Sequence, residues 1–226
     1  MSRVGQLMVQ AQDSKGDYEE LPPTSARFRL VEALVHLGLS VLETPQGRQS
    51  LVAVGVAVVE GINDKRKRNR RVAGHIYRGN LSDMPIWVDR FLTAVRNDFP
   101  CIYINPGCAG EAQAERYNWG EDMSAYTAGT AAVISVSKVI VDNMLFARQQ
   151  DPRVAGDTYD TFKFQMGISI AHEIVHLFVG FLTGTTRAMT PPNANMPGFG
   201  GPQQAEGEAG RYWEKIFLGE LSKTGP

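Results

Sequence analysis

The sequence has little cysteine and almost no net charge. Its two cysteines, Cys101 and Cys108, lack the spacing of a zinc knuckle and come without a secretory signal, so we expect them to be reduced. The 23 lysines and arginines nearly balance the 24 aspartates and glutamates, which gives a net charge of −1. This balance provides no electrostatic reason to expect binding to nucleic acid or to an anionic membrane surface.

Long hydrophobic runs are also missing. No stretch approaches the roughly 20 uncharged apolar residues of a membrane-spanning helix, and the first residues lack the apolar core of a signal peptide. We therefore expect no membrane partner and a cytoplasmic location. The polar residues 1–24 end in Leu21-Pro22-Pro23 and predict an N-terminal arm. Residues 25–226 are long and apolar enough for a single domain with a substantial core.

The main functional signal is a His-Glu-x-x-His motif formed by His172, Glu173 and His176. It lies in an apolar segment, from about residue 160 to Gly184, that favours a helix ending at the glycine. Residues four apart share one face of a helix, so the two imidazoles can bind one zinc ion. Glu173 borders the same face and can act as the general base for a metal-bound water.

The third zinc ligand must be sought among glutamates. The chain contains no His, Cys or Asp after His176. The metzincin pattern also fails, because Val179 replaces its glycine and Leu182 replaces its third histidine. The remaining candidates are Glu206, Glu208, Glu214 and Glu220.

Gly207-Glu208-Ala209, at the start of a second helical segment, resembles the gluzincin element in which a glutamate completes the zinc site. The motifs together also resemble those of a group of uncharacterised fungal His-Glu-x-x-His proteins. The resemblance implies a zincin-like α+β domain and favours Glu208 over Glu206 as the ligand. Thermolysin-type gluzincins carry an Asp one turn later to orient a zinc-bound histidine, whereas this chain has Tyr212.

Glu214 falls on the polar side of the predicted helix, so we expect it to be solvated.

The rest of the chain predicts a small mixed sheet preceded by a helical hairpin. Apolar periodicity indicates helices over residues 25–42 and 85–97. Residues 51–59 could form a helix or a buried strand, and we favour the helix. The basic run at residues 64–71 is expected to be a solvated loop. Strands are predicted at residues 74–77, 101–105 and 131–142, the last passing into a short helix. The Pro- and Gly-rich residues 185–204 are expected to shape one wall of a cleft.

These features predict a zinc-dependent metallopeptidase that cleaves a peptide or protein substrate. Glu173 would be the general base, and Tyr212 or Arg211 could stabilise the oxyanion that develops on the substrate. A zinc hydrolase or lyase acting on a small molecule is an alternative, because the same metal site does not require a peptide. A non-catalytic binding module is a third, and a fourth protein ligand or the absence of metal would favour it.

Overall fold

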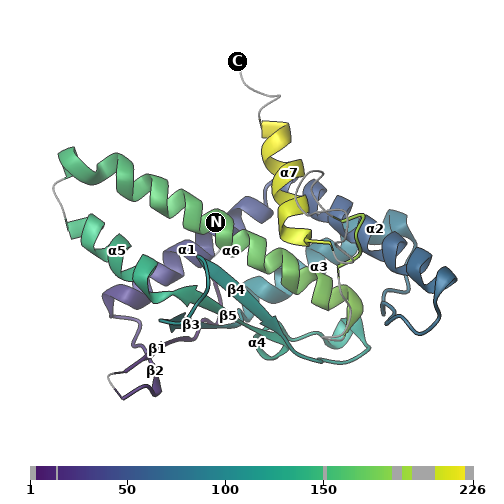
Figure 1. The fold of residues 1–226 in the computed structure, drawn as a ribbon, viewed down its shortest axis with the longest axis horizontal. Coiled ribbons are helices and arrows are strands. Elements are labelled where there is room, and N and C mark those ends of the chain that lie inside the picture. Colours follow the sequence, from purple (N-terminus) through teal and green to yellow (C-terminus); the bar gives the residue numbers. More distant parts are fainter. Residues whose placement is uncertain (1–3, 14, 150–151, 185–189, 195–206, 222–226) are drawn as a thin grey trace.

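The computed structural model describes residues 4–13, 15–149, 152–184, 190–194 and 207–221. These residues form a mixed α+β structure with seven α-helices and one five-stranded sheet (Figure 1). The strands are β1 (Val9–Gln12), β2 (Tyr18–Glu20), β3 (Cys101–Asn105), β4 (Ala112–Arg116) and β5 (Ala132–Ser137). The helices are α1 (Ala26–Leu42), α2 (Pro45–Arg68), α3 (Met84–Asn97), α4 (Ala128–Ala131), α5 (Lys138–Gln149), α6 (Pro152–Thr183) and α7 (Ala209–Leu221).

The sheet has the strand order β2-β1-β3-β5-β4. Its three central strands are parallel, and the edge strands β2 and β4 run antiparallel to their neighbours. Ile102 of β3 and Ile134 of β5 are fully buried, whereas the residues that follow them, Tyr103 and Ser135, are half-buried. This alternation shows that one face of the sheet packs against the helices.

Helix α6 is the central element of the helical layer (Figure 1). It packs against α1, α5 and α7 and runs beside the edge strand β4. Its segment Tyr159–Thr183 is long and apolar enough to cross a membrane, but 78% of its most apolar window is buried inside the fold. A core helix of this kind passes the same test of length and composition as a membrane span, so the finding is weak evidence for a membrane.

Local signals in the sequence explain where these helices begin and end. The hydroxyl of Ser25 accepts a hydrogen bond from the amide of Phe28 at the start of α1, and Thr44 caps α2 in the same way. The predicted stop at Gly184 is confirmed, because this residue follows α6 with a φ of 67° that disfavours other side chains.

The two N-terminal helices are confirmed, but they do not pack as an isolated hairpin. Only Glu43 and Thr44 separate α1 from α2. Nevertheless, α1 packs mainly against α6, whereas α2 packs against α3 and α7. The segment predicted as an arm contributes to the sheet, since β1 pairs with β3 and its Val9 is fully buried.

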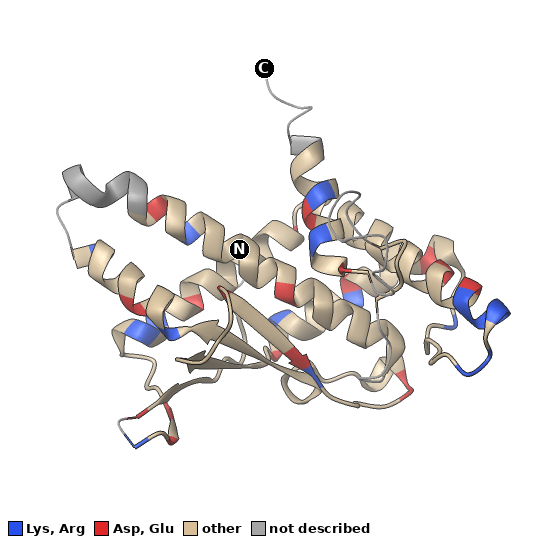
Figure 2. Cartoon of the chain, viewed as in Figure 1, with Lys and Arg blue, Asp and Glu red and all other residues tan. Residues whose placement is uncertain are grey.

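Three local predictions were wrong. Residues 74–77 form no strand, and the amide of Ile76 donates to the carbonyl of Leu182 at the end of α6. The basic run is not wholly a loop, because α2 continues through it to Arg68, and Figure 2 shows its lysines and arginines, in blue, on the last turns of this helix. The long strand predicted over residues 131–142 ends at Ser137, where α5 begins.

Candidate metal centre

The two motif histidines come from the buried half of α6. They lie one helical turn apart, and their Nε2 atoms are 3.3 Å from each other. The side chain of His172 is 14% exposed and that of His176 is 25% exposed. The surrounding residues Ile174, Val175, Leu177 and Phe178 are buried in the core. The helix is therefore fixed by packing on its apolar sides, and its remaining side presents both imidazoles.

Glu208 is the residue just before α7, and its side chain reaches these histidines. It caps that helix, since its Oε2 accepts from the amide of Arg211. Its own amide donates to the carbonyl of Ala194 at 3.0 Å. The short segment 190–194 is in turn attached to α2, because the side chain of Asn193 donates to the carbonyl of Ala57. The position of Glu208 thus depends on contacts with α6, α7 and α2.

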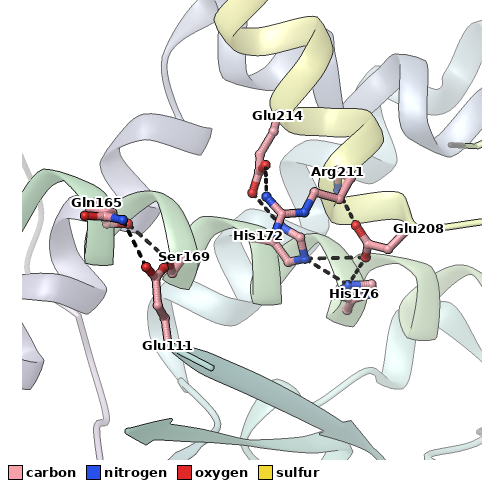
Figure 3. Close-up of polar contacts among 8 residues, drawn as sticks. All are labelled: Glu111, Gln165, Ser169, His172, His176, Glu208, Arg211 and Glu214. Atoms are coloured by element: carbon pink, nitrogen blue, oxygen red, sulfur yellow. Dashed lines mark hydrogen bonds and ion pairs between the residues drawn. The ribbon is translucent and has the colours of Figure 1, made fainter. Parts of the chain in front are cut away.

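His172, His176 and Glu208 form a group that could bind a metal ion, because one donor atom of each lies within 4.8 Å of the others. Oε1 of Glu208 is 2.5 Å from Nε2 of His176 and 3.4 Å from Nε2 of His172 (Figure 3). Among the described residues, this buried oxygen has no hydrogen bond of normal angular geometry. The three donor atoms are therefore close enough together to bind one ion.

Glu214 lies behind His172 and orients it. Its Oε1 is 2.6 Å from Nδ1 of His172, and its Oε2 accepts from the guanidinium of Arg211 at 2.9 Å (Figure 3). A carboxylate accepts hydrogen bonds, so Nδ1 carries the proton and Nε2 is left as the metal-binding nitrogen. The expectation that Glu214 would be solvated was wrong, since its side chain is only 17% exposed. It supplies the orienting carboxylate that Tyr212 cannot.

The charges of this cluster are strongly coupled. Burial opposes the imidazolium of His172, but Glu208 and Glu214 outweigh this effect and raise its pKa to about 10. Burial alone would raise the pKa of Glu208, yet His172 and His176 hold it well below its usual range. The pKa of Glu214 is also lowered, because His172 and Arg211 outweigh its burial. Without a metal, the site is an ion-paired network.

Glu173 lies between α6 and the edge of the sheet. Its Oε2 accepts a hydrogen bond from the backbone amide of Ala114 in β4 at 2.7 Å. The residue is 9% exposed, and burial raises the pKa of its carboxyl group even though His176 and His172 act in the opposite direction. The Ala114 contact therefore holds a carboxylate of raised basicity beside the two histidines.

A cavity of about 940 Å³ opens onto this group. The motif residues His172 and Glu173 line it together with Glu208 and Arg211. It continues along α6 to Thr161 and is bounded by the loop that leads into β4 and by α7. Two of the three candidate metal ligands, His172 and Glu208, thus face a space large enough for a substrate.

The remaining sequence-based candidates fall in different places. Arg211 lines the cavity and pairs with Glu214. Tyr212 does not line the cavity and packs against the hydrophobic core. Glu206 and the side chain of Glu220 lie outside the described residues, as do most of residues 185–204, which were expected to shape or cover one wall of the cleft. Of the described glutamates, Glu208 is the one that joins the histidines as a candidate ligand.

Sequence reasoning missed Gly210, although it decides how closely α7 approaches the site. A Cβ atom on this residue would lie 2.4 Å from both Nε2 and Cδ2 of His172. Such a separation is far below normal contact, so the helix can lie against the imidazole only with glycine here. The glycine is visible in the sequence Glu-Ala-Gly-Arg, but its importance follows only from the packing of α7 against α6.

No protein-family model matches this chain, and no curated protein or solved structure matches it significantly.

Proposed function

We propose that this protein is a zincin-like, zinc-dependent metallopeptidase, with His172, His176 and Glu208 as ligands and Glu173 as general base. The observation that carries the proposal is the grouping of three possible ligand atoms beside a cavity that His172, Glu173 and Glu208 line. Two imidazoles and one carboxylate are a donor set of catalytic zinc sites, which leave a coordination position open. Tetrahedral zinc separates its donor atoms by about 3.3 Å. The separations of 3.3 Å and 3.4 Å at Nε2 of His172 fit this value, whereas the 2.5 Å between Nε2 of His176 and Oε1 of Glu208 is a direct contact that must lengthen when zinc binds.

The chain's own residues fit the chemistry of amide hydrolysis. Bound zinc would supply a water of lowered pKa and polarise the carbonyl of the substrate. Glu173 would take the proton from the water and pass it to the leaving amine, and its raised pKa suits a group that must both gain and lose a proton. The amide of Ala114 holds one carboxylate oxygen and so fixes the orientation of the base.

The shape of the cavity favours an extended substrate. Its lining runs along α6 from Thr161 to Glu173, which corresponds to about 18 Å of helix axis. This length matches about five residues of extended chain. The cavity also lies beside the start of β4, a strand at the edge of the sheet. A peptide is therefore the substrate class that uses the whole cavity.

The first test is the zinc content of the purified protein beside its activity on a peptide library. We expect about one zinc per chain, which is lost in the double variant His172→Ala/His176→Ala. Glu173→Gln should keep its zinc and lose at least about 100-fold in cleavage rate. A protein that stays free of zinc after zinc is supplied, or a Glu173→Gln variant of full activity, would contradict the proposal.

A small-molecule substrate is the second candidate, and the cavity volume favours it. About 940 Å³ falls within the range of roughly 300–1,000 Å³ of small-molecule pockets. The same zinc site would then act as a hydrolase or lyase. Zinc binding without cleavage of any library peptide, combined with turnover of amide or ester metabolites that Glu173→Gln abolishes, would favour this function.

A further inference from the structure

A carboxylate that the proposed zinc chemistry does not use lies in the same cavity, between the candidate metal group and the Thr161 end. Glu111, in the loop before β4, lines the cavity and points toward α6 (Figure 3). One of its oxygens accepts from Nε2 of Gln165 at 3.1 Å, and the other accepts from the hydroxyl of Ser169. These two donors lie four residues apart on α6, so they fix the orientation of the carboxylate.

The position of Glu111 relative to the site follows from the helix. Gln165, Ser169 and Glu173 are spaced by four residues and share one face of α6. Glu111 therefore lies about 6–12 Å from Glu173 along the helix axis. This is the length of about two to four residues of extended chain, so one substrate can reach both carboxylates.

Glu111 differs in its partners from Glu208 and Glu214, which also line the cavity. Glu208 faces two histidines, and Glu214 is paired with His172 and Arg211. Glu111 is bound by a neutral amide and a neutral hydroxyl, and among the described side chains no lysine, arginine or histidine forms an ion pair with it. Neutral donors orient a carboxylate without cancelling its charge. This end of the cavity is consequently negative.

Apolar groups accompany this charge. Phe164, Ile168 and Leu218 line the same cavity. Phe164 is 54% exposed and Leu218 is 40% exposed, so both present apolar surface that a ligand can contact. The cavity thus offers one negative group beside an apolar surface.

We propose that Glu111 is a specificity residue that binds a positively charged group of the substrate while Phe164, Ile168 and Leu218 contact its apolar parts. The cation is either the amino-terminal ammonium of a peptide or a lysine or arginine side chain, which share the chemistry that a carboxylate recognises. This inference rests on the proposed peptidase function and names the substrate that the site prefers.

The test measures peptide binding to the zinc-loaded Glu173→Gln protein by calorimetry, so that cleavage does not interfere. The probes are one apolar hexapeptide in three forms: with a free amino terminus, N-acetylated, and N-acetylated with one lysine. We expect at least one cationic form to bind about tenfold tighter than the neutral form, and Glu111→Gln to abolish that preference. The form that responds identifies the source of the cation.

Two further variants separate recognition from misfolding. Glu115→Gln removes an exposed carboxylate of β4 that does not line the cavity, and it should leave all dissociation constants unchanged. Glu111→Lys should reverse the preference toward an N-acetylated peptide carrying glutamate, a gain that a misfolded protein cannot show. Equal binding of cationic and neutral peptides, no binding of any cationic peptide, or an equal effect of Glu115→Gln would overturn the inference. Failure of the peptidase proposal itself is seen separately, as absence of zinc or of cleavage with Glu173 intact.

Discussion

The carboxylate of Glu214 lies 2.6 Å from Nδ1 of His172, on the side of the ring opposite the candidate metal ligands. The contact fixes both the tautomer and the ring plane of this histidine. It also joins α7 to α6 at a second point, about 1.7 turns beyond Glu208. The helix and the residue just before it therefore provide a candidate ligand and the group that orients another candidate ligand.

Removal of this orienting contact should weaken metal binding. We expect Glu214→Ala to bind zinc about 10–100-fold more weakly than the wild type, measured by competition with a chelator of known affinity. Lys215→Ala, an exposed neighbour on α7, is the matched control and should bind zinc normally. An unchanged affinity in Glu214→Ala would show that His172 is positioned by packing alone.

A methyl group at Gly210 should disrupt the site. Gly210→Ala places a Cβ atom against the buried ring of His172, so α7 or the imidazole must move and zinc binding should be lost. Gly219→Ala on the same helix meets no atom within 4 Å of its new Cβ among those described. It should bind zinc fully and gain up to about 1 kcal/mol in the free energy of unfolding. Equal zinc content in the two variants would contradict the close approach of α7.

The metal-free protein should lose stability as the pH rises. The pKa of His172 is raised from 6.5 to about 10 in the folded state. A histidine whose pKa is raised on folding stabilises the folded state fully when the pH is below about 6.5. This contribution is lost as the pH rises past about 10. The melting temperature of chelator-treated protein should fall over this interval more than that of His172→Gln, which lacks the imidazole. Identical pH profiles for the two proteins would argue against the ion-paired network.

A buried ion pair away from the site should contribute to stability. Arg96 of α3 donates two hydrogen bonds to the carboxylate of Glu43 at the end of α1, and its side chain is only 7% exposed. Glu43→Ala leaves this guanidinium buried without its carboxylate and should lower the free energy of unfolding by about 3 kcal/mol. Asp89→Ala breaks the exposed pair with Arg48 and should cost less than about 1 kcal/mol. Denaturant titration of both variants measures the difference.

The sequence predicted the features that depend on residues close together in the chain. The helix around His172 and His176 follows from apolar periodicity and ends at the glycine expected. The structure also groups Glu208 with both histidines, as the choice of this glutamate requires, although that choice rested partly on a resemblance. The zinc itself and the catalytic roles of Glu173 and Arg211 remain predictions.

The features that were missed depend on contacts between distant segments. Glu214 is polar on its own helix, and only the docking of α7 on α6 buries it against His172. The strand β4 has the sequence Ala-Gln-Ala-Glu-Arg, without a β-branched or aromatic residue, so its pairing with β5 decides its conformation. Conversely, residues 74–77 have strand-like composition but bond to the end of α6. Tertiary contacts outweigh local propensity in each case.

The packing of the apolar side of α7 fixes the position of Glu208 at the start of this helix. Trp213 is fully buried and stacks on Phe217, which is 6% exposed, so hydrophobic packing attaches this helix to the core. The position of Glu208 is thereby fixed in the metal-free protein, so little conformational entropy remains to be lost when a metal binds. The metal affinity of the site consequently depends on packing behind the candidate ligands. A smaller residue at position 213, which touches no ligand atom, would make the position of Glu208 less fixed and leave the two histidines in place.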